Sequence, residues 1–265
     1  MKLQIPNVCF HQIIQKGNIV RLDKFLTETA ALTRSEGKKR IKEGRVFVDG
    51  VPAKRPEQQV DEKMSEVCLD GKKLSYVQYE YFMLHKPAGV VSATEDRKER
   101  TVLDLIDSVK KKDLFPVGRL DKDTEGLLLI TNDGDLAHRL LSPKKHVDKL
   151  YFVRLEKEIT EEAVTAFAEG LHVDEELTAK SALLRKLTAE EERSFGGEGF
   201  SAAVVITEGK FHQVKRMFQA VDNQVLYLKR MAMGSLYLDE TLVAGEYRSL
   251  TEAEIEGLKQ YDVEK

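Results

Sequence analysis

The segment Val117–Asp135, VGRLDKDTEGLLLITNDGD, constrains the fold more than any other part of this sequence. It begins as a charged turn, continues as the apolar run Gly126–Thr131 and ends in turn-forming residues. A continuous apolar run bounded by turn signals is typical of a buried strand. A carboxylate directly before such a strand is held rigidly and partly withdrawn from water. We therefore predict a buried strand here, with a candidate functional carboxylate, Asp121 or Asp123, at its start.

Length and composition place the chain among two-domain globular proteins. Its 265 residues with a 42% apolar fraction suffice for a packed core in each domain. A net charge of -3 argues against a polybasic protein, although a local basic patch can still bind nucleic acid. Cys9 and Cys68 show neither disulfide nor metal-ligand spacing. We find no membrane-length apolar run and no secretory signal, and therefore expect a cytoplasmic protein.

Residues 1–19 do not fit the pattern that follows them. Codons for Lys16-Gly17 would resemble a ribosome-binding site, and Val20 can be encoded by the start codon GTG. We therefore hypothesise that translation starts at Val20 and that residues 1–19 are a leader. The alternative is a genuine extension that is poorly ordered. Mass spectrometry of the native protein distinguishes the two, because a peptide beginning at Met1 would exclude the leader.

Residues 20–74 predict a small α/β domain. Apolar residues at helical spacing indicate a first helix from Leu22 onward. A second helix follows Thr33 as N-cap and is ended by Gly44, and Gly37 inside it costs ~1 kcal/mol relative to Ala. Short strands come next, with two hairpin-type turns at Asp49-Gly50 and Asp70-Gly71.

This small domain carries a local excess of positive charge. Between residues 21 and 55 there are ten basic and five acidic residues, a net charge of +5. A charged helix is often only a solvated surface, but its position before a β-hairpin favours contact with RNA phosphates. The candidate RNA-binding residues are Arg21, Arg34, Lys38, Lys39 and Arg45.

After a linker at 75–80, residues 81–262 predict one larger α+β domain. Its periodicity alternates between strand and helix along the chain. The expected strands are 81–84, 126–131, 150–155 and 202–207, and the expected helices are 136–141, 161–170 and 211–221.

Three kinds of site fit the carboxylates before the buried strand. A calcium loop matches its first half, but Asn132 stands where the bidentate Glu is needed. A carboxylate pair for glycoside hydrolysis requires Asp121 and Asp123 to act together. A single nucleophilic or basic carboxylate is the third possibility.

The segment GRLDKDTEGLLLITNDG resembles the signature motif of the RsuA group of RNA pseudouridine synthases. The resemblance extends along nearly the whole chain from Val20. RLDKFL…GRVFVDG resembles an S4 RNA-binding domain, and YFMLHKPAGVVSA resembles the first motif of the catalytic domain. KLYFVRL and EGKFHQVKRMF resemble two further catalytic motifs. The resemblance implies that Asp121 is the catalytic carboxylate, that Tyr151 faces the target base and that Lys215 pairs with the carboxylate. We expect Arg216, the neighbour of Lys215, to bind RNA.

The resemblance also implies the fold and the substrate. The fold is α+β, with an S4-type domain followed by a catalytic domain that has a mixed, largely antiparallel sheet. HQVKRMF is closer to the small-subunit enzymes than to their large-subunit relatives, which implies uridine 516 of 16S rRNA, met within an assembling particle, as the substrate. Three alternatives stay open: a 23S rRNA synthase of the same family, a non-catalytic S4-domain assembly factor and a carboxylate hydrolase. No obligate protein partner is evident.

Pseudouridine formation suits these residue types. The N1–C1′ bond breaks, the uracil turns, and C5 joins C1′ without a redox step, so we expect neither cofactor nor metal. One carboxylate, Asp121, can attack the sugar or base or stabilise charge, and Lys215 keeps it ionised. Tyr151 can stack on the extruded base and move the C5 proton. Arg119 can fill the gap left by the flipped nucleotide or bind phosphate, and we expect His212 to orient a loop.

Overall fold

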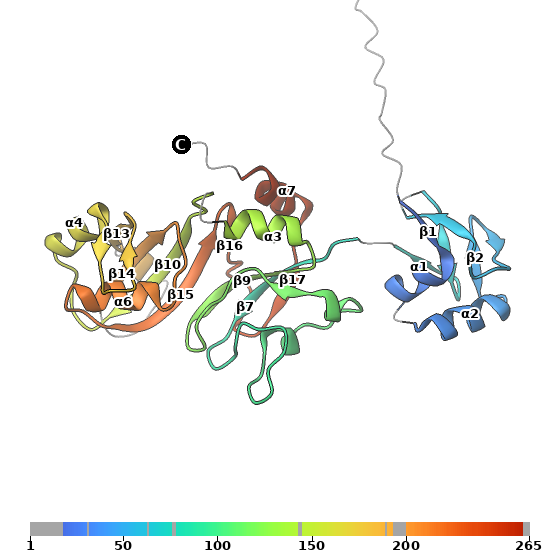
Figure 1. The fold of residues 1–265 in the computed structure, drawn as a ribbon, viewed down its shortest axis with the longest axis horizontal. Coiled ribbons are helices and arrows are strands. Elements are labelled where there is room, and N and C mark those ends of the chain that lie inside the picture. Colours follow the sequence, from blue (N-terminus) through green and yellow to red (C-terminus); the bar gives the residue numbers. More distant parts are fainter. Residues whose placement is uncertain are drawn as a thin grey trace, which may run out of the picture. The chain divides into compact units, whose positions relative to one another are not determined.

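The computed structural model describes residues 18–261 except 31, 63, 76–77, 143–144, 189 and 193–199. The chain divides into two compact units, Met1–Gln78 and Tyr79–Lys265, and the division falls inside the segment that we expected as a linker (Figure 1). Of the expected leader, residues 1–17 lie outside the described residues, whereas Ile19 begins the first strand. The start at Val20 therefore stays a prediction. No helix among the described residues is long and apolar enough to cross a membrane.

The first unit has two helices packed with short strands. Its helices are α1 (Leu22–Thr29) and α2 (Arg34–Lys42). A four-stranded sheet has the order β3-β2-β5-β6, and β1 pairs with β4. The strands are β1 (Ile19–Arg21), β2 (Val46–Val48), β3 (Val51–Pro52), β4 (Gln59–Asp61), β5 (Val67–Leu69) and β6 (Lys72–Leu74). A single apolar cluster joins α1, α2 and the strands, with Leu22, Phe25 and Leu26 almost fully buried.

Local sequence explains where these elements begin and end. Thr33 caps α2 by accepting a hydrogen bond from the Glu36 amide at 3.2 Å, and the Glu36 carboxylate accepts one from the Thr33 amide at 2.8 Å. Both predicted hairpin turns have positive φ at their Asp and Gly, which is the conformation that a tight two-residue turn requires. The two predicted helices and the two predicted turns of this unit are therefore confirmed.

The second unit is built on one mixed sheet with the strand order β13-β14-β10-β15-β9-β7-β17. All its pairings are antiparallel except that of β15 with β9, which confirms the predicted sheet type. β8 extends the sheet beside β9, and β16 extends it beside β15. The strands are β7 (Tyr81–Lys86), β8 (Phe115–Pro116), β9 (Glu125–Thr131), β10 (Lys149–Leu155), β13 (Leu183–Lys186), β14 (Phe200–Ile206), β15 (Val225–Met233), β16 (Leu236–Tyr237) and β17 (Tyr247–Ser249).

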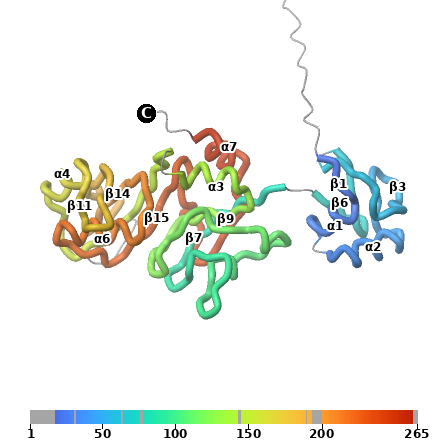
Figure 2. Tube along the Cα trace, viewed as in Figure 1, coloured from blue at the N-terminus to red at the C-terminus, as the bar shows by residue number. Residues whose placement is uncertain are grey.

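Helices and short connections complete this unit. The helices are α3 (Gly134–Leu141), α4 (Glu161–Glu169), α6 (Gln213–Ala220) and α7 (Glu252–Gln260), with 3₁₀ turns at Val102–Leu105 and Lys111–Asp113. A small ribbon pairs β11 (Leu171–His172) with β12 (Thr178–Ala179). Figure 2 follows the chain from the β7–β9 end of the sheet to the end formed by β10, β14 and α6.

The central strands are buried on both faces, as the apolar run predicted. Because side chains alternate along a strand, Leu128 and Ile130 of β9 join one apolar cluster with α4 and α6. Leu127 and Leu129 join a second cluster with α3 and α7. Figure 1 shows α3 and α7 close together over the β7–β9 end of the sheet.

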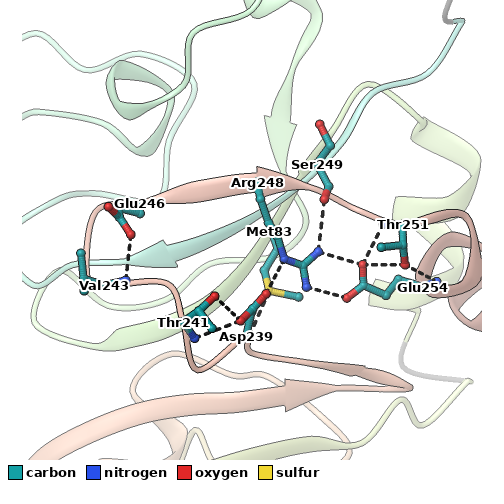
Figure 3. Close-up of polar contacts among 9 residues, drawn as sticks. All are labelled: Met83, Asp239, Thr241, Val243, Glu246, Arg248, Ser249, Thr251 and Glu254. Carbon is teal, nitrogen blue, oxygen red and sulfur yellow. Dashed lines mark hydrogen bonds and ion pairs between the residues drawn. The ribbon is translucent and has the colours of Figure 1, made fainter.

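Arg248 ties the C-terminal segment to this unit (Figure 3). Its guanidinium donates to Asp239 at 2.6 Å and to both carboxylate oxygens of Glu254 at 2.9 and 2.8 Å. Glu254 also accepts from the backbone amide of Thr251, which caps α7. The Asp239 amide donates to the Met83 sulfur at 3.2 Å, so this network joins β17 and α7 to the adjacent strand β7.

Most predicted boundaries differ from the observed ones by one or two residues, and two of these differences have a clear structural cause. The helix expected over 211–221 begins at Gln213, because His212 adopts the left-handed conformation with φ of 50°. The strand expected over 81–84 continues to Lys86, whose side chain is fully buried. A lysine before Pro-Ala-Gly has the local pattern of a loop, and only its contacts with the neighbouring segment keep it in the strand.

Candidate active site

Asp121 lies in the loop between β8 and β9, directly before the buried strand. The amide of Thr124 donates to the Asp121 carbonyl at 3.1 Å, so residues 121–124 form a tight turn. Thr124 itself is buried and lies next to the first residue of β9. The carboxylate thus projects from a turn that is fixed at one end by the core of the sheet.

The motif YFMLHKPAGVVSA supplies the other side of this turn. The ammonium of Lys86 donates to the carbonyls of Lys122 at 3.2 Å and Thr124 at 2.8 Å. The amide of Gly89 donates to the Lys122 carbonyl at 2.7 Å. The Ser92 hydroxyl donates to the Leu120 carbonyl at 2.9 Å and accepts from its amide at 3.1 Å. Residues 86–92 therefore hold the backbone on both sides of Asp121.

Lys86 is a candidate positioning residue that the sequence did not reveal. It also donates to the Pro87 carbonyl at 3.0 Å, so its ammonium has three carbonyl acceptors. Burial lowers the pKa of Lys86 to about 8, although Asp123, Glu125 and Asp121 act in the opposite direction. The three contacts hold this cation under the turn that carries Asp121.

Gly126 lets the catalytic turn join the rest of the sheet. Its φ is +104°, and an added Cβ would lie 2.2 Å from the carbonyl oxygen of Arg230. Gly126 and Arg230 are paired partners in the parallel β9–β15 ladder, so the two backbones meet closely here. Only glycine meets both the conformational and the steric requirement.

Asp121 faces two side chains from the segment EGKFHQVKRMF. Its carboxylate lies 3.4 Å from the Lys215 ammonium and 3.6 Å from Nε2 of His212. The side chains of Asp121 and Lys215 are about one-fifth exposed, at 23% and 21%. Sequence resemblance paired Lys215 with Asp121, and the structure brings them together.

The shortest contact of Lys215 is nevertheless with Asp123, at 2.6 Å. This hydrogen bond holds the pKa of Asp123 below its usual range, against the effect of partial burial. Asp123 is 73% exposed, whereas Asp121 lies in a hollow of the protein. One lysine therefore serves both carboxylates, and only one of them can meet an enclosed ligand.

Tyr151 lines the same inner hollow as Asp121. It stands in the middle of β10 with only 7% of its surface exposed, between Val204 of β14 and Arg230 of β15. No hydrogen bond to its hydroxyl is found within the described part of the chain. The inner hollow has a volume of about 50 Å³, enough for only a few water molecules, so a base enters only after side chains at its rim move.

The remaining predicted residues have different surroundings. Arg119 borders the inner hollow beside Asp121. Arg216 points away from it, because its guanidinium donates to Asp174 at 3.0 and 2.5 Å. Its contact with RNA stays a prediction, and its observed contact fixes α6 to the loop after β11.

The five basic residues proposed from the N-terminal segment all belong to the first unit. Arg21 donates to Asp23 at 3.0 and 2.8 Å, and Arg45 donates to Asp70 at 2.5 and 2.6 Å. Lys39 lies 4.0 Å from Glu43. The other two, Arg34 and Lys38, are exposed on α2.

This site combines a rigid carboxylate, a cation and a buried aromatic side chain. The carboxylate can act as a nucleophile or base, or stabilise a developing positive charge. Tyr151 offers its ring as a stacking surface and its hydroxyl for proton transfer. Lys215 lies within 4 Å of both carboxylates, at 3.4 Å from Asp121 and 2.6 Å from Asp123.

Comparison with known families assigns both units. Residues 80–220 match the family described as RNA pseudouridylate synthase, and residues 20–67 match the S4 domain. The first of these matches covers more than half of the chain.

Individual relatives are similar over nearly their whole length. The chain is 46% identical to the uncharacterized RNA pseudouridine synthase YtzG of Bacillus subtilis, with coverage of 91% of this chain and 99% of the relative. It is 40% identical to the ribosomal small subunit pseudouridine synthase A of Pasteurella multocida, with coverage of 89% and 98%. A crystal structure of a pseudouridylate synthase matches with a TM-score of 0.61 and 38% identity, covering 90% of this chain and 99% of that one.

Proposed function

Because this chain belongs to the RNA pseudouridylate synthase family, we propose that it converts a uridine of small-subunit rRNA to pseudouridine. The specific target that we propose is uridine 516 of 16S rRNA, met within an assembling particle. Relatives that are 38–42% identical and named ribosomal small subunit pseudouridine synthase A support this choice of RNA.

One observation carries the assignment of the catalytic residues. Asp121 and Tyr151 line one hollow, and Lys215 and His212 approach the same carboxylate from α6 and its preceding turn. Asp121 attacks or stabilises the sugar or base when the N1–C1′ bond breaks. Lys215 favours the ionised carboxylate, and Tyr151 stacks on the extruded uracil in a site from which water is displaced.

RNA binding is divided between two surfaces in this proposal. Exposed cations of the S4 domain bind phosphates, which gives affinity and register without reading sequence. Arg119, at the rim of the hollow, contacts the backbone of the flipped nucleotide. Selection of the uridine then takes place at the catalytic hollow itself.

The test follows the hydrogen that the reaction expels. 16S rRNA, free and as an assembly intermediate, carries tritium at uracil C5, and tritium release is measured with wild type and Asp121→Asn. We expect release by wild type and a loss of at least ~10³-fold in the variant, because a residue acting in the transition state is removed. Asp135→Asn, an exposed Asp at the start of α3, is the matched control and should keep wild-type activity.

Three results would contradict the proposal. Release from 23S rRNA alone would identify a large-subunit synthase. Release that survives Asp121→Asn would remove Asp121 from the chemistry. Tight salt-sensitive binding without release from any rRNA would indicate a binding protein. Mapping the modified position then tests uridine 516.

A further inference from the structure

An aromatic pair stands beside the catalytic hollow and is not explained by packing. The ring of Phe211 stacks on the ring of His212, with centroids 3.8 Å apart and planes 18° apart. Phe211 is 72% exposed and belongs to none of the three apolar cores. A large apolar side chain that the core does not use is free to contact a ligand.

The backbone that carries this pair is held in an unusual conformation. His212 has a φ of 50°, which a non-glycine residue adopts at a cost. The Phe211 carbonyl accepts a hydrogen bond from Arg216 at 3.3 Å, and Arg216 is itself fixed by Asp174. The position of the Phe211 ring is therefore maintained by α6 and the loop after β11.

Phe211 and His212 line an outer hollow of about 430 Å³. The opposite wall is formed by residues 91–93, and Arg119 and Asp121 border this hollow as well as the inner one. Tyr151 lines only the inner hollow, and Phe211 lines only the outer one. The two spaces thus meet at Asp121, with Tyr151 in the inner one, Phe211 in the outer one and His212 bordering both.

We propose that the outer hollow is a subsite for the nucleotide next to the target uridine, whose base stacks on Phe211. This inference rests on the proposed RNA substrate. When a uridine is flipped into the inner hollow, its neighbour loses a stacking partner. Phe211 replaces that partner, so the free energy needed for flipping falls. Stacking accepts any base, so the subsite contributes affinity rather than sequence selection.

Arg216 has a positioning role in this arrangement. Its guanidinium contacts Asp174 and the Phe211 carbonyl rather than the hollow. In this proposal it acts on RNA through the Phe211–His212 turn.

The first experiment compares Phe211→Ala and Phe211→Trp with wild type. The substrates are 16S and 23S rRNA transcripts with tritium at uracil C5, assayed separately. We expect Phe211→Ala to raise KM roughly 5- to 150-fold, the range for loss of one stacked base, with a smaller change in kcat. Phe211→Trp should keep a KM near that of wild type. The control Tyr237→Ala removes an aromatic ring that is 65% exposed on β16 and borders neither hollow, so its KM should not change.

A second experiment detects the stacked base directly. A fragment around the uridine that wild type modifies carries 2-aminopurine on the 5′ or the 3′ side of that uridine. Wild type should quench the fluorescence at one of the two positions, and Phe211→Ala should not. A Phe211→Ala enzyme with wild-type KM and wild-type quenching would overturn the subsite while leaving the proposed function intact. Absence of tritium release by wild type from both transcripts and from the small-subunit assembly intermediate would overturn the function and the subsite together.

Discussion

Lys86 and Lys149 of the catalytic domain are buried and donate to main-chain carbonyls, whereas Arg34 and Lys42 of the S4 domain are exposed on α2. No ion pair in the described ranges involves Arg34 or Lys42. The buried ammonium groups hold main-chain segments in place through hydrogen bonds to carbonyls. The exposed side chains on α2 remain available to bind phosphate. The same residue types therefore brace the turn that carries Asp121 in one domain and leave exposed positive charge on a helix in the other.

Glycine is required by close backbone packing at Gly126 of the catalytic domain, and its replacement should have the largest effect on stability. Gly126→Ala places a Cβ 2.2 Å from a backbone oxygen at a positive φ, so we expect a loss of at least ~4 kcal/mol in the free energy of unfolding. Tritium release should fall with it. Gly134→Ala is the control, because its Cβ would meet nothing within 4 Å. Urea unfolding curves that are equal for Gly126→Ala and wild type would refute the tight β9–β15 contact.

Lys86→Met tests whether a buried cation holds the catalytic turn. It removes the ammonium donor from the carbonyls of Pro87, Lys122 and Thr124, of which Lys122 keeps the Gly89 amide, and this should cost ~2–4 kcal/mol of stability. We also expect kcat to fall by about 10²-fold, since a small displacement of Asp121 disturbs its approach to the substrate. Urea unfolding and single-turnover tritium release measure the two effects. A variant with wild-type kcat would show that the turn keeps its shape without Lys86.

Lys149 gives a prediction for pH dependence. Burial, together with nearby Arg230, lowers its pKa in the folded protein to about 8, below the ~10.4 of an unfolded chain. Between these values the unfolded chain binds more protons, so the free energy of unfolding gains up to ~1.4 kcal/mol per pH unit as pH rises from 8 to 10. Lys149→Met should reduce this rise by that amount. Urea titrations at pH 7, 8, 9 and 10 give the change of unfolding free energy with pH for wild type and variant. Equal changes in the two proteins would show that burial does not lower the pKa of Lys149.

The exposed cations of α2 should affect RNA binding rather than stability. Replacing Arg34 and Lys42 together by Gln should reduce the slope of log K against log salt by ~1.4–1.8, the value for two lost phosphate contacts. Filter binding of 16S rRNA at several salt concentrations measures this slope. Lys24→Gln, whose lysine already lies 3.6 Å from Glu28, should change it less. An unchanged slope in the double variant would exclude α2 from the RNA interface.

Gly37→Ala should have the smallest effect, and of opposite sign. The added methyl group would lie 3.6 Å from the Leu26 side chain, an ordinary contact, and φ is not positive there. We expect α2 to gain ~0.5–1 kcal/mol, because alanine loses less backbone entropy in a helix. Native-state hydrogen exchange of the α2 amides measures this gain. Destabilisation would show that the α1–α2 packing has no room for the methyl group.

Much of the fold was predictable because its signals are local. The Thr33 capping box, the two Asp-Gly turns and the Gly170 stop of α4 each depend on residues close in sequence. The start of α6 was not predictable in this way, because the left-handed backbone of His212 accompanies contacts between the Phe211 carbonyl and Arg216. Asp121 was predicted from its motif. Lys86 was not predicted, because its ammonium contacts carbonyls that lie 36 and 38 residues away in the sequence.

The sequence by itself determined the two domains, the buried strand after Asp121 and the membership of a synthase family. These depend on hydrophobic periodicity, turn residues and long motifs, all of which are local in the chain. Only the tertiary structure decided that Lys215 contacts Asp123 more closely than Asp121 and that Arg216 faces Asp174. It also decided that Phe211 remains exposed beside the catalytic carboxylate. A side chain's partner depends on which distant segments the sheet brings together, and one segment's pattern does not contain that information.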